Sequence, residues 1–418
     1  MRLRPWPLVF LLSATATASY LCRVNISVAG ALLMKDFGLS QIQMGRAFSA
    51  FLLGYALFQI PAGMLADRWG ARRILLLSAW WWVALTILQA LVGWGPLRAG
   101  AGATLMILLT LRFLLGIGEA PTFPGAAQGV ARWIPPDRQG RANGIVIAAV
   151  GLGSAIAPPL LSTIMVRAGW RAALLLSASP ALILALVWLF VREHGSDREE
   201  GVQTRPQPQG PVDLQPLRSL RFVLLTASYT LQGYVGYIFV FWFYLYLVQE
   251  RHFDLLRGAA LSSLPWIFSI LSIPLGGLIS DRLVSGRAGL KWGRRIVPIV
   301  GLALSGLFLA LGARTGNAYS AAAYLALSTA LVLSVEGPFW ATMMEIARSG
   351  SGTAGGIMNM GSNLGGLVSP ALTPVLAAHI GWENALMLAA AISVLGAVMW
   401  LGITPAPPAD PTPSQTTI

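Results

Sequence analysis

The chain has 418 residues, of which 56% are hydrophobic and 11% are charged, and this charge content excludes an ordinary soluble domain, which carries about 25%. The net charge of +13 is better explained by Lys and Arg in cytoplasmic loops than by binding of nucleic acid, because the charges lie between long apolar runs. The single cysteine, Cys22, excludes an intramolecular disulfide.

The apolar runs recur along the whole chain, and a bilayer core of about 30 Å takes about 20 helical residues to cross. Helices are expected because unpaired backbone groups are costly in lipid. The sequence therefore predicts an all-α membrane protein with twelve transmembrane helices in two pseudo-symmetric six-helix bundles. The predicted spans are 8–34, 43–66, 73–94, 103–130, 142–165, 171–191, 222–248, 258–280, 296–313, 317–345, 354–378 and 384–403.

The stretch between the sixth and seventh spans is rich in Pro, Gln and charge, which is typical of a flexible linker. The end of the chain has the composition of a disordered tail. The predicted division is an N-terminal bundle at 1–192, a cytoplasmic linker at 193–221, a C-terminal bundle at 222–404 and a tail at 405–418.

The two halves repeat the same landmarks at a nearly constant offset. Asp67-Arg68 after the second span returns 214 residues later as Asp281-Arg282 after the eighth span. Glu119-Ala-Pro in the fourth span returns 217 residues later as Glu336-Gly-Pro in the tenth span. Because both halves have six spans, the repeat is a parallel one, as in transporters built from two related bundles.

Charge also predicts the orientation. With both termini inside, the inner segments hold 19 of the 29 Lys and Arg residues and the outer segments hold 8. This bias predicts cytoplasmic termini in an integral protein of the plasma (inner) membrane.

The connection after the second span runs Gly-Met-Leu-Ala-Asp-Arg-Trp-Gly-Ala-Arg-Arg from residue 63, with a weaker copy after the eighth span. It resembles the signature loop of the major facilitator superfamily. Glycines permit a tight turn, and an aspartate can cap a helix and pair with arginines. We expect a conformational latch at the cytoplasmic face, and the alternative is ordinary loop charge. The residues of this latch are Gly63, Asp67, Arg68, Gly70, Arg72, Arg73, Asp281 and Arg282.

Within that superfamily, three segments resemble the anion:cation symporter family, whose members carry organic anions such as sugar acids. They begin at Tyr20 in the first span, at Arg112 in the fourth and at Gly233 in the seventh. The family pattern around Tyr20 is Tyr-x-Asp-Arg-x-Asn, which matches Arg23 and Asn25. We expect Tyr20, Arg23 and Asn25 of this segment to bind the substrate, and the resemblance implies that the seventh span lines the substrate cavity. The family's acid before the arginine is Cys22 here, which puts two-site proton coupling in doubt.

Arginine keeps its proton even at mid-membrane depth, where it costs about 3 kcal/mol on insertion scales. We interpret Arg23 and Arg112 as partners of an anionic substrate, with a structural ion pair to an acid on another helix as the alternative for Arg23. Glu119 is two helical turns from Arg112, too far for a direct pair, and each is expected to meet another group. Since Glu119 can titrate, it is the candidate for proton coupling, and a packing salt bridge is the alternative.

The second half supplies further candidates. Glu336 is the repeat counterpart of Glu119 and is a second candidate for proton coupling, with capping or packing as an equal alternative. Tyr234 and Tyr237 share a helix face, and Asn359 and Asn363 lie one turn apart. All four are candidates for substrate binding, against core packing and interhelical hydrogen bonding as alternatives.

These residues predict a secondary active transporter that moves a small organic anion, a sugar acid or carboxylate, by alternating access with proton symport. No enzyme activity, cofactor, metal site or nucleic-acid partner is expected. The expected partners are an anionic substrate, protons and the lipid bilayer, and the protein is expected to be a monomer. The alternatives are an exporter of drug-like or lipidic compounds, an anion exchanger, and a receptor that binds without carrying.

Overall fold

The computed structural model describes residues 5–97, 100–191, 215–347 and 351–405. Within these ranges the regular elements are helices alone. The linker interior and the tail predicted above lie mostly outside the described residues. The elements are α1 (Pro5–Phe37), α2 (Gln41–Ala90), η1 (Gly95–Leu97), α3 (Ala101–Glu119), α4 (Thr122–Trp133), α5 (Pro136–Ser177), α6 (Ser179–Phe190), η2 (Gln215–Arg218), α7 (Leu220–Phe241), α8 (Phe243–Gln249), α9 (Leu255–Ser285), α10 (Gly289–Arg314), α11 (Ala318–Ser334), α12 (Glu336–Ala347) and α13 (Ser351–Met399).

Three of the long helices each contain one glycine with a positive φ. These glycines are Gly70 in α2, Gly169 in α5 and Gly381 in α13, with φ of 80°, 81° and 81°. Glycine adopts this conformation readily because it has no β-carbon. Each break falls between two predicted spans. Across the described residues, nine helical segments are long and apolar enough to cross a membrane, and they make this an integral membrane protein.

Four other predicted spans are interrupted within their length, and one of them, the sixth, divides into α5 and α6 at Ala178. The fourth span divides into α3 and α4 at Ala120-Pro121, the seventh into α7 and α8 at Trp242, and the tenth into α11 and α12 at Val335. Sequence analysis predicted each of them as one continuous span. Interrupted helices in membrane transporters occur where the backbone lines a site.

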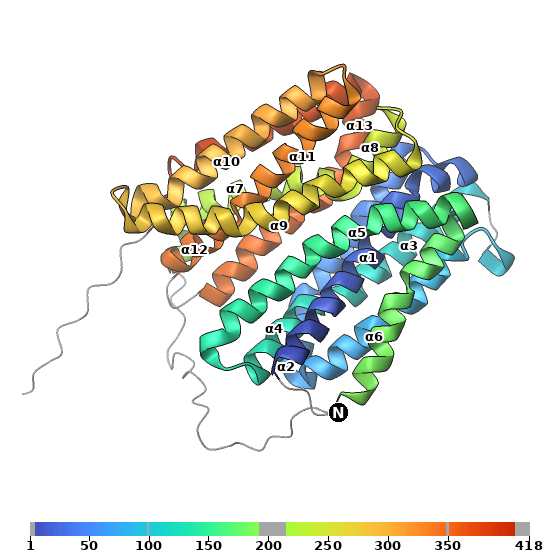
Figure 1. Cartoon of the computed structure of the whole chain (residues 1–418), viewed down its shortest axis with the longest axis horizontal. Helices are drawn as coiled ribbons and strands as arrows, with labels where there is room; N and C mark the ends of the chain where they lie inside the picture. Colours follow the sequence, from blue (N-terminus) through green and yellow to red (C-terminus); the bar gives the residue numbers. More distant parts are fainter. Residues whose placement is uncertain (1–4, 98–99, 192–214, 348–350, 406–418) are drawn as a thin grey trace, which may run out of the picture.

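Figure 1 shows the helices before residue 191 (blue to green) on one side of the molecule and those after residue 215 (yellow to red) on the other. They meet where α5 packs on α9 and α2 packs on α13, a surface that we call the seam. At one end of the seam, Phe48 of α2 stacks on Phe241, with ring centroids 5.0 Å apart, and meets Trp242 edge-on at 5.4 Å. Ser49 donates to the Leu367 carbonyl of α13 at 2.7 Å. This end of the seam is therefore closed by direct packing.

Candidate functional site

A buried ion pair joins α1 to α3. Arg23 Nε donates to Glu119 Oε1 at 2.8 Å, and Arg23 Nη2 lies 2.7 Å from the same oxygen. The two side chains are 1% and 0% exposed. The structure thus realises the ion pair that was the alternative interpretation of Arg23. A buried charge is stable only when it is paired with an opposite charge. An ionisable residue inside a membrane is a candidate for a functional site.

Aromatic rings surround the Arg23 guanidinium on several sides. Its Cζ lies 4.4 Å from the ring centroid of Tyr20, 4.8 Å from that of Tyr55 and 5.1 Å from that of Phe51. Nη1 also donates to the Tyr20 hydroxyl at 3.1 Å. Cation–π contacts of this kind hold a cation that has lost its water. They fix the guanidinium in one position, where it can present donors to an anion.

Arg112 lies on α3 beside this pair and is 0% exposed. Its Nη2 donates to the Arg23 carbonyl at 3.1 Å, and its Cζ lies 4.7 Å from the Phe51 ring centroid. Among the described residues, its Nε and Nη1 have no hydrogen-bond partner, and neither does Glu119 Oε2. Buried donors without partners are rare, and a bound ligand or water is the usual explanation. The cluster of two arginines and one glutamate also carries one surplus positive charge.

An amide bridge crosses the seam from α2 to α13. Gln59 Oε1 accepts from Asn363 Nδ2 at 3.2 Å and from Asn359 Nδ2 at 3.3 Å, and Tyr237 donates to Asn363 Oδ1 at 3.2 Å. Three of the predicted substrate residues are thus brought together. Sequence analysis missed Gln59 and Tyr55, although a glutamine and a tyrosine one turn apart in an apolar span are a readable signal.

Two predicted substrate residues lie away from this bridge. Asn25 Nδ2 donates to Ser177 of α5 at 2.9 Å, inside the N-terminal half. Tyr234 is 6% exposed and lies on α7, where Gly365 of α13 approaches its backbone inside the C-terminal half. Their contacts are those of helix packing, and a substrate role for them stays a prediction.

Glu336 begins α12 and has neutral hydrogen-bond donors around it. Tyr229 donates to Oε2 at 2.8 Å and Gln232 donates to Oε1 at 2.9 Å. The repeat counterpart Glu119 faces two arginines instead. The two related glutamates therefore have different electrostatic environments.

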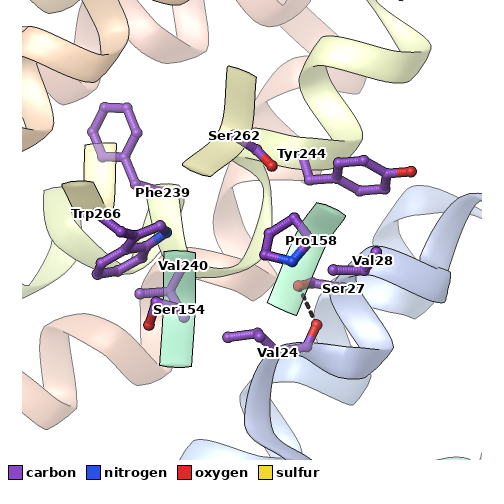
Figure 2. A pocket seen from close by; sticks show the side chains of 10 residues that line it. All are labelled: Val24, Ser27, Val28, Ser154, Pro158, Phe239, Val240, Tyr244, Ser262 and Trp266. Atoms are coloured by element: carbon purple, nitrogen blue, oxygen red, sulfur yellow. Dashed lines mark hydrogen bonds between the residues drawn. The ribbon is translucent and has the colours of Figure 1, made fainter. Parts of the chain in front are cut away.

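A small cavity lies in the seam between the halves, and Figure 2 shows its lining. Hydroxyl groups from α1, α5, α8 and α9 contribute to it, together with the edge of Trp266. Ser27 donates to the Val24 carbonyl at 2.7 Å, one residue after Arg23 in the chain. The hydroxyl residues of the lining are Ser27, Ser154, Tyr244 and Ser262. The described residues contain no group of three or more potential metal ligands.

Comparison with known proteins assigns this arrangement of helices. The model of the Major Facilitator Superfamily matches residues 11–347 and 283–417. The chain belongs to the major facilitator superfamily. The resemblance drawn from the signature loop is confirmed at this level. The chain is a membrane transporter and not an enzyme.

The names of three relatives in the superfamily describe transporters of organic anions. The chain is 33% identical to the probable sulfoacetate transporter of Cupriavidus necator, over 93% of this chain and 91% of the relative. It is 28% identical to the hexuronate transporter of Bacillus subtilis, over 94% and 93%. It is also 28% identical to a probable galactarate/D-glucarate transporter of Escherichia coli, over 95% and 92%.

The superfamily fold is also seen in solved structures. A bacterial homologue of the human lysosomal transporter Spinster, in an inward-facing and unoccupied conformation, matches with a TM-score of 0.78 and 19% identity. The match covers 96% of this chain and 99% of that chain. The occupied, inward-facing form of the Spinster homologue matches with a TM-score of 0.74. At this identity the likeness concerns the fold alone.

The superfamily's signature loop lies at the end of the first part of α2. Gly70 forms the break there, and the next amide, from Ala71, donates to Gln128 of α4 at 2.8 Å. Arg72 donates to the carbonyls of Trp188 and Leu189 at 3.2 and 2.9 Å. Gly63 is partly buried, and Asp67, Arg68 and Arg73 are exposed.

In the second copy of the loop, Asp281 and Arg282 are both exposed. Arg294 of α10 joins Asp281 at 2.5 Å to Glu345 of α12 at 2.8 Å. This ion-pair network and the Arg72 contacts stay within one half each. A latch that acts across the halves remains a prediction.

Proposed function

We propose that the protein is a secondary active transporter that takes up a small organic anion, a sugar acid or short sulfonate, together with a proton. The observation that carries the proposal is Arg112, a fully buried cation whose Nε and Nη1 donors have no partner among the described residues. Free N–H donors of a guanidinium form short, charge-assisted hydrogen bonds with the oxygens of a carboxylate or sulfonate. The names of the relatives support the same chemical class.

Glu119 couples the proton because it competes with the substrate for Arg23. When ionised, its carboxylate holds the guanidinium through Oε1, as seen here. Protonation removes that charge, and Arg23 is then free to bind the anionic group of a substrate. Release of the proton restores the ion pair and displaces the anion. Glu119 thus replaces the substrate's charge in the empty carrier, so that Arg23 is never left unpaired.

Charge balance limits the substrates that this cluster accepts. With Glu119 ionised, Arg23 and Arg112 leave one positive charge to neutralise, which suits a monoanion. With Glu119 protonated they leave two, which suits a dianion such as an aldarate or a sulfonated carboxylate. Because Cys22 replaces the acid of the family pattern and is buried, it adds no negative charge at neutral pH. One proton per dianion is the stoichiometry that we propose.

Glu336 is the second group that we propose to titrate. Its partners Tyr229 and Gln232 are neutral donors, so protonation leaves no cation unpaired. Glu336→Gln tests this role through the pH dependence of uptake. A flatter pH profile supports titration, whereas an unchanged profile assigns Glu336 to packing.

The helices support twelve spans in two six-helix bundles, divided as in the sequence analysis. Three of the nine membrane-length segments in the described ranges contain a positive-φ glycine, at residues 70, 169 and 381. Dividing these three segments at the glycine gives twelve spans. Alternating access then follows from rocking of the bundles about the seam. We place both termini in the cytoplasm and the protein in the inner membrane, because the inner segments carry most of the basic residues.

The test is uptake into proteoliposomes with an imposed proton gradient. Radiolabelled glucuronate, glucarate and sulfoacetate serve as probes, each with and without a proton ionophore. Uptake of at least one probe that collapses with the ionophore supports the proposal, and Arg23→Gln and Arg112→Gln should abolish it. Counterflow without any net proton-driven uptake would instead identify an exchanger. Binding without counterflow would identify a receptor, and transport of apolar cations in place of acids would identify an exporter.

A further inference from the structure

The Glu119 carboxylate stands at a point where the helix is interrupted. Glu119 ends α3, and Pro121, which has no N–H, precedes α4. The chain continues with Ala120 N–H donating to the Gly116 carbonyl at 3.0 Å and Gly125 N–H donating to the Pro121 carbonyl at 2.8 Å. A residue at such a break is not held by a regular helix on its far side, so its position depends on other contacts.

Side chains hold the carbonyl groups on both sides of the Glu119 peptide unit. Trp82 Nε1, on the second part of α2, donates to the Gly118 carbonyl at 2.9 Å. Thr122 Oγ1 donates to the carbonyl of Glu119 itself at 2.7 Å. Trp82 is 0% exposed and Thr122 is 1% exposed. In a dry interior, a backbone carbonyl freed by a helix break requires such a donor.

The neighbouring tryptophan fixes the same stretch from the lipid side. Trp81 Nε1 donates to the Leu114 carbonyl of α3 at 2.7 Å, although the ring is 43% exposed. Its ring covers Gly118 so closely that a β-carbon at Gly118 would overlap it. Two adjacent indole N–H groups therefore donate to carbonyl groups of α3 that lie one helical turn apart, directly before Glu119.

We infer that Trp82 and Thr122 are positioning residues for the proton-coupling carboxylate of Glu119. The inference rests on the proposed function of Glu119. Neither side chain contacts Arg23 through a hydrogen bond given by the structure, so both act through the backbone of the break. Their loss would let the carboxylate move relative to the Arg23 guanidinium, with which it makes contacts of 2.7 and 2.8 Å.

The test compares two modes of transport in the same proteoliposomes. Net proton-driven uptake requires the empty carrier to reorient with Glu119 paired to Arg23 in every cycle, whereas in counterflow the carrier reorients only with substrate bound. The probes are radiolabelled glucuronate and sulfoacetate. The variants are Trp82→Phe, which keeps a ring and loses the N–H, and Thr122→Val, which loses the hydroxyl at nearly constant volume.

For both variants we expect the ratio of proton-driven uptake to counterflow to fall by about fivefold, the effect of one buried hydrogen bond. Thr122→Ser keeps the hydroxyl and should restore the ratio. The matched control is Trp188→Phe, which removes an equally buried indole donor, bonded to Thr15 at 3.1 Å in the same half. A purely structural loss lowers both modes together and leaves the ratio unchanged.

Two failures are distinguishable. If Trp82→Phe and Thr122→Val keep the wild-type ratio while Glu119→Gln loses proton-driven uptake, the positioning role is wrong and the proposed function stands. If Glu119→Gln keeps proton-driven uptake, Glu119 does not couple the proton and the proposed function is wrong at that residue. Should Trp82→Phe not fold, the Thr122 pair of variants decides the inference alone.

Discussion

Gly45 of α2 lies directly against the Pro370 carbonyl of α13, so close that a β-carbon on Gly45 would overlap the carbonyl oxygen and touch the Pro374 ring. The contact joins the two halves at the closed end of the seam, next to Phe48 and its aromatic partners. Close approach of backbones through small residues is the usual means of helix association in membranes.

Gly45→Ala should therefore force this end of the seam apart. Overpacking of a tight contact costs about 1–3 kcal/mol, enough to shift a two-state equilibrium severalfold or more. Spin labels at Gln41 and Gln249, whose side chains hydrogen-bond at 3.1 Å, report the separation. We expect a longer distance population in Gly45→Ala. Gly144→Ala is the control, since its added β-carbon meets open space. An unchanged distance distribution in Gly45→Ala would contradict the model of a bistable seam.

Glu119→Gln should increase the extent to which bound substrate stabilises the folded protein. The variant removes the charge that pairs with Arg23, and an unpaired buried cation lowers the free energy of unfolding by about 3–5 kcal/mol. That value is an upper limit here, because the glutamine side-chain oxygen still accepts a hydrogen bond from Arg23. A bound anion replaces the missing charge, so saturating substrate should raise the melting temperature more in the variant than in wild type. Glu383→Gln is the control, because its pair with Arg314 spans 3.9 Å between exposed side chains. Equal ligand-induced shifts in Glu119→Gln and wild type would argue against competition for Arg23.

Arg112→Lys should fail as a conservative substitution. The ammonium group keeps the charge and loses the planar set of guanidinium donors, of which Nε and Nη1 are without a partner among the described residues. We expect KM for an organic acid to rise by about tenfold or more, with little change in protein yield. Arg251→Lys is a suitable comparison, since Arg251 donates to the carbonyls of Gly312, Ala313 and Thr315 and serves the fold. A wild-type KM in Arg112→Lys would show that the free donors do not meet the substrate.

Gln59→Leu should discriminate between substrate classes. The Gln59 side-chain oxygen accepts from two asparagine N–H groups, and the amide groups of this bridge are able to hydrogen-bond the hydroxyl groups of a sugar acid. KM for glucuronate should rise by about tenfold, whereas KM for sulfoacetate, which has no hydroxyl group, should stay within about twofold. Each substrate is the control for the other in one preparation. Equal changes for both acids would assign the bridge to helix packing.

Much of the fold was predictable because a bilayer restricts the choice of structure. Long apolar spans predicted the membrane helices, and the Asp-Arg loop with its copy indicated the superfamily. The breaks at Ala120, Trp242 and Val335 were not predictable, since a proline or aromatic residue in an apolar run is compatible with a continuous helix.

The buried ionisable residues of the candidate site were predictable one by one, but their pairing was not. Burial cost singled out Arg23, Arg112 and Glu119 as soon as they were seen in apolar spans. Helical periodicity gives the face of a helix and not the neighbour across it, so the partnership of residues 23 and 119 needed coordinates. Trp82 was missed because its function lies in an indole N–H aimed at a backbone carbonyl, and composition counts that ring as apolar.

The surplus guanidinium of Arg112 has an electrical consequence. When the empty carrier reorients between its outward-open and inward-open states, about one elementary charge would move through part of the membrane field. This movement is worth up to about 2.3 kcal/mol per 100 mV. A carrier filled by a neutralising anion would move none. The membrane potential would then act only on the reorientation of the empty carrier. Patch-clamp records of a giant liposome should show a transient current that substrate on both sides suppresses.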